Sequence, residues 1–354
     1  MMQTPITIDG SQGEGGGQVL RTSLSLAAIT GRPLRLYNIR AGRSKPGLRP
    51  QHLTAVHAVG RICAARMDGD RLNSRTLEFT PTTPPRGGDY VFDVSDAAQT
   101  FSAGAVTLIC QAILWPLIFA AEPARVRLRG GTFVPYSPPY HYLAHVARPA
   151  FARLGAHFAT ELVTWGWMQA GGGEMVLTVE PAARLQGVAF APERSTKVEG
   201  VAAVTNLPAD IPQRMARRAH NLLQEMGLQP VITPVRATGK GPGAGIVLWL
   251  PGAGFSCLGR KGFPADKVAE EAVAQLRAFV DNGGLINSSA VDEHLADQLL
   301  LPMALAHGRS SLTTNRITLH TLTNADLLRQ WLPVSLHVAG ELGQPGTITV
   351  TNEV

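Results

Sequence analysis

One pattern of predicted elements recurs three times in this sequence, and this repeat constrains the fold more than any other feature. The unit is a helix, a strand, a polar loop, a second helix and a closing strand. In the first copy the helices are expected over 18–31 and 53–69 and the strands over 33–40 and 76–81. The pattern of each copy predicts a small sheet backed by two helices. The apolar faces of the three copies are expected to pack together.

The other two copies keep this order of elements but not the amino-acid letters. The second begins with an apolar helix over 103–120 and closes with a strand over 174–181. The third has a helix over 293–308, a strand over 315–320, a helix over 325–338 and a closing strand over 347–353. In each copy a polar loop follows the middle strand. Three such loops could therefore converge on one site.

The segment 185–261 does not follow the repeat. It contains strand-like stretches, a helix pattern over 209–227 that ends at a glycine, and a flexible glycine-rich stretch. We expect a small inserted α/β domain here, and a helix over 264–282 that returns to the large domain. The predicted fold class is therefore α/β (α+β). A large domain comprises 1–184 and 262–354, and the inserted domain comprises 185–261.

Charge and cysteine content limit the partners and the compartment. The net charge is +6, which favours polyanionic partners. The three cysteines, Cys63, Cys110 and Cys257, have no metal-ligand spacing and are expected to be buried thiols. The first nine residues lack the apolar core of a signal peptide, and the longest apolar run, 112–121, is too short to cross a bilayer. A cytoplasmic protein without a membrane segment is the expectation.

Two neighbouring motifs in the first copy are suited to phosphate chemistry. The stretch DGSQGEGGGQVLR (9–21) surrounds Glu14 with glycines, and IRAGRSKPGLRPQH (39–52) holds Arg40 and Arg43 in a loop broken by proline and glycine. Glycine allows backbone N–H groups to approach a phosphate, and arginine supplies forked donors for its oxygens. A carboxylate near a phosphate needs a cation between them, so Glu14 is a candidate Mg²⁺ or Mn²⁺ ligand. Arg21, on the helix after the glycines, is expected to face the same pocket.

The later copies add aromatic rings and an imidazole. Phe133, Tyr136 and Tyr140 in the middle loop are candidates for stacking on bases, although packing onto the core is an equally good interpretation. In the third copy, His294 and Asp297 share one face of a helix, and His320 follows the expected strand. His320 therefore occupies the position that corresponds to the arginine loop and is a candidate catalyst.

Taken together, these motifs resemble those of the RNA 3′-terminal phosphate cyclases. The resemblance rests on DGSQGEGGGQVLR, RAGRSKPGLRPQHL, GGT with SPP, EHLADQLLLPMALA and TLHTLTN, and it covers almost the whole chain. It implies a large domain of three βαβαββ repeats with a smaller inserted α/β domain. It also implies an ATP-dependent, ligase-class enzyme that converts an RNA 3′-phosphate into a 2′,3′-cyclic phosphate and releases AMP and pyrophosphate.

The resemblance further implies roles for individual residues. His320 would be the nucleophile that becomes covalently adenylylated, and Glu14 would be the metal ligand. The remaining roles fall into two groups: ATP contacts (Gln111, His294, Leu295, Ala296, Asp297 and Gln298) and contacts to the RNA phosphate (Arg21, Arg40, Arg43 and Gln51).

Three alternatives stay open from the sequence. One is a non-cyclising, rRNA-processing member of the same family, which would lack the nucleophilic histidine. Another is an RNA-binding module without catalysis, which would need no carboxylate in the glycine loop. The third is a small-molecule transferase related to the enolpyruvyl transferases. The sequence also leaves open whether the chain forms a homodimer.

Overall fold

The computed structural model describes residues 4–98, 102–168, 170–193, 195–284 and 289–353. The first repeat consists of β1 (Ile6–Asp9), α1 (Gly17–Thr30), β2 (Leu34–Tyr37), α2 (Pro50–Ile62), β3 (Arg66–Asp68) and β4 (Leu77–Thr80). Its sheet has the order β1-β2-β4-β3, in which β1 and β2 are parallel and the other pairs are antiparallel. The helix expected over 53–69 ends at Ile62, and Ala64 has a φ of 46° where the chain turns into β3.

The second repeat has the same topology. It consists of β5 (Gly88–Asp93), α3 (Val94–Ala98), α4 (Val106–Ile118), β6 (Ala124–Gly130), α5 (Tyr140–Tyr142), the π-helical turn η1 (Leu143–Ala147), α6 (Arg148–Arg153), β7 (Phe158–Thr164) and β8 (Gly173–Val179). Its sheet order, β5-β6-β8-β7, again pairs the first two strands in parallel. The repeat predicted from the sequence pattern therefore corresponds to one supersecondary unit.

The third repeat is a shortened version of the same unit. It consists of α9 (Glu293–Leu305), β13 (Gly308–Thr314), α10 (Leu319–Trp331), β14 (Ser335–Ala339) and β15 (Gly346–Asn352), and its sheet has the order β13-β15-β14. In place of a first strand, Val291 forms one parallel bridge to Thr314. The mixed α/β fold class is confirmed.

The structure corrects two elements of the third repeat. The helix expected over 325–338 is α10, which ends at Trp331, and residues 335–339 form the strand β14 instead. The strand expected over 315–320 is wrong, because the strand is β13 and ends at Thr314. His320 instead lies in the first turn of α10. A capping box fixes this start: the Thr318 side chain accepts from the backbone N–H of Thr321, and the Thr321 side chain bonds back to Thr318.

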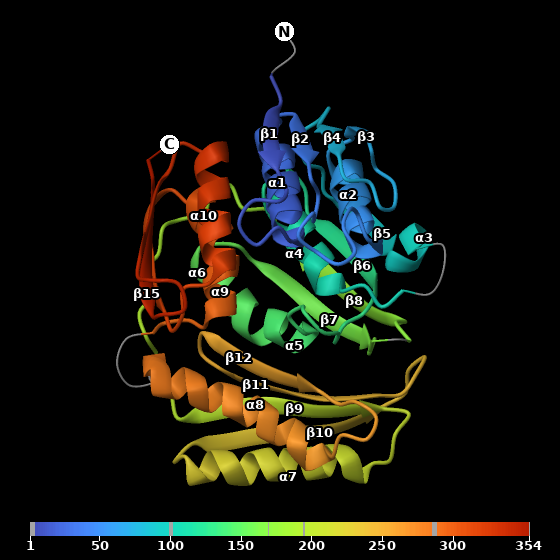
Figure 1. Ribbon diagram of the computed structural model, residues 1–354, viewed down its shortest axis with the longest axis vertical. Helices are drawn as coiled ribbons and strands as arrows, with labels where there is room; N and C mark the ends of the chain where they lie inside the picture. The colour runs from blue at the N-terminus through green and yellow to red at the C-terminus, as the bar shows by residue number, and fades with distance from the viewer. Residues whose placement is uncertain (1–3, 99–101, 169, 194, 285–288, 354) are drawn as a thin grey trace.

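The inserted unit lies below the repeats in Figure 1 and has its own sheet and core. It contains β9 (Lys197–Thr205), α7 (Asp210–Glu225), β10 (Gln229–Ala237), β11 (Gly243–Leu250) and β12 (Ala253–Leu258), followed by α8 (Ala265–Phe279) and the π-helical turn η2 (Val280–Gly284). The sheet order is β10-β9-β11-β12. The helix that we expected to return to the large domain, α8, packs on this unit, where Val268 and Leu276 share a core with Met215 of α7. The domain limits at 184 and 262 stay a prediction, and we propose that the inserted unit extends through α8.

A single apolar core joins the three repeats, with α1, α2, α4, α9 and α10 at its centre (Figure 1). A separate aromatic cluster joins the second repeat to the insert. It contains Phe133, Trp165 and Trp167, which pack against Ala203 and Val247 of the insert sheet. Among the described helices, none is long and apolar enough to span a bilayer.

Candidate active site

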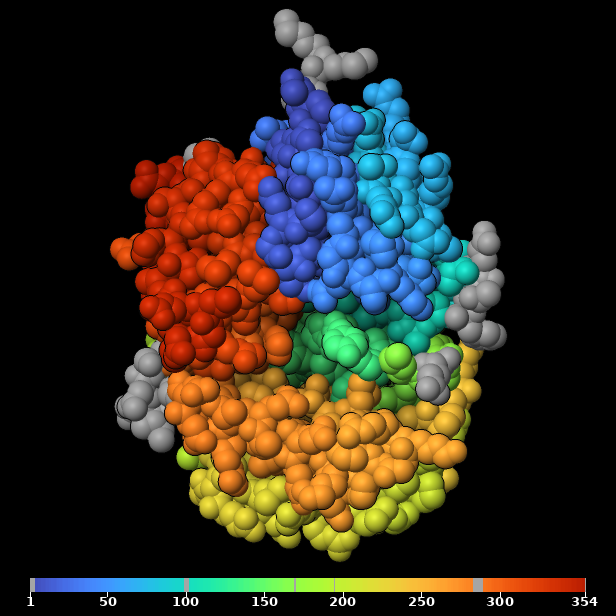
Figure 2. All heavy atoms as spheres, in the orientation of Figure 1, coloured from blue at the N-terminus to red at the C-terminus, as the bar shows by residue number. Residues whose placement is uncertain are grey.

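A cleft of about 750 Å³ opens where the three repeats and the insert meet. In Figure 2, green atoms of the second repeat are visible in a recess framed by the blue first repeat, the red third repeat and the orange insert. Ten of the residues singled out from the sequence line this cleft: Glu14, Arg21, Arg40, Arg43, Gln51, Gln111, His294, Asp297, Gln298 and His320. Leu295 and Ala296 do not line it, because both are fully buried in the core.

The His320 imidazole is held from one side only. Its Nδ1 lies 2.6 Å from Oε1 of Gln18 and 3.3 Å from Oε2 of Glu14. Both partner atoms are acceptors, so the neutral ring carries its proton on Nδ1. The lone pair is then on Nε2, where it is available to an electrophile in the cleft.

The surroundings of His320 keep the ring neutral. Burial, followed by the positive charges of Arg21 and Arg43 and by His294, lowers the pKa of His320 to about 4. An imidazole that is unprotonated at neutral pH is a competent nucleophile.

The glycine loop brings Glu14 to this ring. Glu14 forms an ion pair with Arg43 on its other oxygen, and its backbone N–H donates to Thr323 of α10 at 3.1 Å. Gly13 has a φ of 58°, and a Cβ at this position would lie 2.0 Å from the Thr323 hydroxyl. This close approach explains the glycine at position 13 and joins the first repeat to the third.

Arginines and a buried histidine also line the cleft. Burial lowers the pKa of Arg21 to about 10, so it keeps its charge at neutral pH. Arg40 donates to the backbone carbonyls of Lys45 and Gly47, which hold its loop in shape. His52 is 5% exposed, and burial together with the surrounding arginines lowers its pKa well below the ordinary value. His52 is therefore neutral and adds no charge to the arginine cluster. The sequence analysis did not identify this residue.

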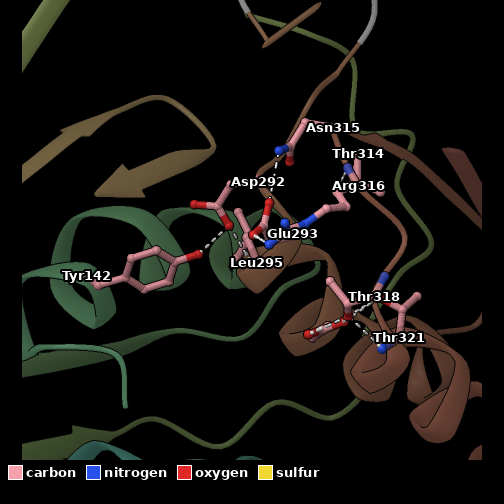
Figure 3. Close-up of polar contacts among 10 residues, drawn as sticks. Tyr142, Asp292, Glu293, Leu295, Thr314, Asn315, Arg316, Thr318 and Thr321 are labelled. Carbon is pink, nitrogen blue, oxygen red and sulfur yellow. Dashed lines mark hydrogen bonds and ion pairs between the residues drawn. The ribbon is translucent and has the colours of Figure 1, made fainter. Parts of the chain in front are cut away.

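Asp297 connects the two helices of the third repeat. It is 8% exposed and accepts hydrogen bonds from the hydroxyls of Thr318 and Thr321, which flank the start of α10 in Figure 3. Burial raises the pKa of Asp297 to about 7, although both threonines lower it. Its carboxyl group is thus engaged in positioning the helix turn that carries His320.

Asp292 joins three parts of the chain at the edge of the cleft. Its carboxylate caps α9 by accepting from the N–H of Leu295, and it also accepts from the Tyr142 hydroxyl at 2.7 Å (Figure 3). A further bond comes from the backbone N–H of Gly254 in the insert, at 2.8 Å. Ser256 and Gln275 of the insert also line the cleft, so the inserted unit contributes to its wall.

Next to the cleft, polar groups on α4 and α9 border a small cavity of about 40 Å³. Gln111, Asp297 and Gln298 line both spaces. Gln298 donates to the backbone carbonyl of His294, whereas its own Oε1 is buried and has no partner among the residues that the structure describes. That acceptor is available to a ligand group with an N–H or O–H.

The three aromatic residues of the middle loop differ in how far they are exposed to solvent. Phe133 and Tyr140 are buried, at 2% and 8% exposure, and therefore pack on the core. Tyr136 is fully exposed at the cleft rim and has a φ of 60°. Of the three, only Tyr136 is free to stack on a ligand.

Gln18 is the principal site residue that the sequence analysis did not identify. It lies in the first turn of α1, one turn before Arg21, so the two share a helix face. That spacing was a usable signal. Its contact with His320, however, spans 302 residues of chain, and no local pattern reports it.

Comparison with known proteins gives a consistent result. A family model described as RNA 3′-terminal phosphate cyclase matches residues 12–338. The RNA 3′-terminal phosphate cyclase of Gloeothece citriformis is 49% identical over 331 residues, which cover 92% of this chain and 93% of that protein. The protein of the same name from Methylococcus capsulatus is 48% identical over 328 residues, which cover 91% and 90%. A solved structure, the enolpyruvyl transferase NikO from Streptomyces tendae, was also matched, and the alignment covers 98% of this chain and 81% of the NikO chain. The identity is 13% and the TM-score is 0.25, from which no shared fold follows.

Proposed function

The chain belongs to the RNA 3′-terminal phosphate cyclase family, and we propose on this basis how its cleft carries out the family's reaction. The enzyme uses ATP to convert an RNA 3′-phosphate into a 2′,3′-cyclic phosphate. The observation that carries our assignment of residues is the geometry at His320, whose Nδ1 is held by Gln18 and Glu14 while Nε2 is left free.

In the first step, Nε2 of His320 attacks the α-phosphorus of ATP. A nitrogen–phosphorus bond forms, the bond to the β-phosphate oxygen breaks, and pyrophosphate leaves. Glu14 and Gln18 stabilise the positive charge that develops on the ring, because both present oxygen atoms to Nδ1–H. Arg21 and Arg43 are near enough to lower the pKa of the ring, and they offset the negative charge of the phosphates.

In the second step, an oxygen of the RNA 3′-phosphate attacks the same phosphorus, and the histidine leaves. The resulting phosphoanhydride has a good leaving group, AMP, whereas a phosphate monoester has only a very poor one. The neighbouring 2′-oxygen then attacks the terminal phosphorus and expels AMP. Because this closure is intramolecular, holding the end in place contributes up to about 7 kcal/mol of avoided entropy.

The same proposal assigns the binding roles. Gln111, His294 and Gln298, with the third-repeat helix α9, hold the nucleotide. Arg40, Arg43 and Gln51 meet the RNA phosphate. Asp297 positions α10 through Thr318 and Thr321. Leu295 and Ala296 are buried and pack α9 on the core, and their contact with ATP stays a prediction.

Glu14 suits a divalent cation that is held mostly by phosphate oxygens. It provides one carboxylate in the cleft, and among the residues that the structure describes no cluster of three His, Cys, Asp or Glu could bind a metal by itself. Mg²⁺ and Mn²⁺ bind in this way, through one or two carboxylates and the substrate phosphates. A bound cation would neutralise negative charge on the phosphates.

Two further points concern where the protein works and whether it forms an oligomer. The three cysteines are free and buried, which supports a cytoplasmic location. The homodimer stays a prediction. A non-catalytic or rRNA-processing role is not favoured, because the curated relatives are named as cyclases.

The proposed function is tested with a 3′-phosphorylated oligoribonucleotide labelled at its 5′ end. Wild-type enzyme with ATP and Mg²⁺ is expected to make the 3′ end resistant to phosphatase. Reactions without ATP, or with a 3′-hydroxyl oligonucleotide, serve as controls. Failure to convert the 3′-phosphate with either Mg²⁺ or Mn²⁺ would contradict the assignment.

A further inference from the structure

The net positive charge of this protein comes from its first repeat. Residues 1–88 contain twelve Lys and Arg against five Asp and Glu, a net charge of +7. The other 266 residues contain twenty against twenty-one, a net charge of −1. The whole excess of positive charge therefore lies on the first repeat, which is coloured blue in Figure 2.

Part of this excess lies on a surface that continues outward from the cleft. The arginine loop (39–49) is bonded at both of its ends to the β3–β4 loop (69–76). Leu48 exchanges backbone hydrogen bonds with Asn73 and Ser74, at 2.8 and 3.0 Å, and the Ile39 N–H donates to the carbonyl of Arg75. The two loops form one continuous platform.

This platform is rigid where the two loops meet. Gly47 has a φ of 80°, and a Cβ there would lie 2.3 Å from the carbonyl oxygen of Asn73. The Arg49 guanidinium donates to the Asn73 side chain at 2.7 Å. A surface that is fixed before binding loses little entropy when a ligand arrives.

Three exposed cations lie on this platform: Lys45, Arg71 and Arg75. Among the described residues, their side chains make no hydrogen bond or ion pair. Some other exposed cations are paired, as in Arg218 with Glu270 and Arg329 with Asp326. Unpaired cations next to a phosphate-binding cleft are what a polyanion requires.

We propose that Lys45, Arg71 and Arg75 form a docking surface for the RNA strand upstream of its 3′-phosphate. This inference rests on the proposed function, which brings the terminal phosphate against Arg40 and Arg43. The preceding nucleotides must leave the cleft, and the platform offers their phosphates unpaired positive charge on the loop that carries Arg40 and Arg43 and on the loop bonded to it. The contacts are to the backbone, so they favour longer RNA without reading its sequence.

The test compares two double variants on substrates of two lengths. Arg71→Ala with Arg75→Ala removes two platform charges. Arg217→Ala with Arg309→Ala removes two exposed charges from α7 and β13, away from the platform. Each protein is assayed with a 3′-phosphorylated dinucleotide and a 3′-phosphorylated dodecanucleotide, and dodecanucleotide binding is titrated against salt by fluorescence anisotropy.

For the platform variant we expect the KM for the dodecanucleotide, divided by the KM for the dinucleotide, to rise about tenfold. The slope of log affinity against log salt should become shallower by about 1.4, or about 0.7 for each lost phosphate contact on a single strand. The Arg217/Arg309 variant should keep both wild-type values. Equal changes for both substrate lengths, or an equal change of slope in both variants, would overturn the proposal. If wild-type protein cyclises neither substrate, the proposed function fails, and the salt titration still decides the docking surface.

Discussion

The reactivity of His320 depends on what its neighbours leave free. Gln18 and Glu14 occupy Nδ1, and burial, together with the charges around the ring, keeps it unprotonated. Glu14 in turn shares its carboxylate between Arg43 and the ring. Histidine, glutamate and arginine were all visible in the sequence as candidates. The orientation of the ring was not, because it depends on a glutamine 302 residues away.

Replacing Gln18 with alanine should slow enzyme adenylylation without preventing folding. The ring would lose one of its two acceptors at Nδ1, and groups that orient a reactive imidazole in this way typically contribute about 10–100-fold. The rate is measured by incorporation of label from α-labelled ATP in the absence of RNA. Gln330→Ala, on the exposed part of α10, is the matched control and should label at the wild-type rate. A Gln18→Ala protein that labels as fast as wild type would refute this role.

At the scale of elements, the site is built from helix starts. Glu14 and Gln18 lie at the start of α1, His294 at the start of α9 and His320 at the start of α10. The repeat pattern predicted the order of these elements and that they converge. It misplaced the strand before His320, because the alternating letters of 315–320 fit a strand while the Thr318 capping box starts a helix instead.

The buried carboxyl between α9 and α10 should make stability depend on pH. The pKa of Asp297 is about 7 in the folded protein and near 3.9 when unfolded, so the folded state binds more protons between these values. The contribution of the Asp297 carboxyl to folding stability is therefore most favourable at low pH and is lost as pH rises towards 7. The free energy of unfolding of Asp297→Asn, measured with urea, should therefore rise relative to that of wild type by a few kcal/mol between pH 5 and pH 8.

The control for this effect is Asp326→Asn, which removes an exposed carboxyl on α10 that pairs with Arg329. Its difference from wild type should not vary with pH over the same range. A constant difference between Asp297→Asn and wild type would show that the Asp297 carboxyl has an ordinary pKa.

At the scale of the whole molecule, the insert is attached to the second repeat through stacked rings. His141 stacks on Trp165 with centroids 5.1 Å apart and lies 6.2 Å from Trp249 of the insert. His145 stacks on Trp249 at 4.3 Å. No sequence pattern indicated this interface, since its rings come from separate strands and helices. Only the existence of an insert was predictable.

This interface should loosen in acid. Burial, and then His145, lower the pKa of His141 to about 4, below its unfolded value near 6.5. The separated state therefore binds more protons between these values, and docking weakens as pH falls from 6.5 to 4. Burial also lowers the pKa of His145; Arg148 lowers it further, and Glu199 raises it. Tryptophan fluorescence should report a transition in this range.

His141→Phe keeps a stacking ring and removes the charge, so the acid transition should shift to lower pH. His157→Phe, at an exposed position, is the control and should behave as wild type. A transition that is unchanged in His141→Phe would mean that His141 does not couple the insert to pH.

The proposed mechanism requires that AMP is transferred to His320. Wild-type protein is incubated with ATP and a divalent cation without RNA, digested at neutral pH, and its peptides are analysed by mass spectrometry. We predict one AMP group on the peptide that contains His320 and no label in His320→Ala. AMP found on another residue, such as His294 or Lys45, or label that persists in His320→Ala, would contradict it.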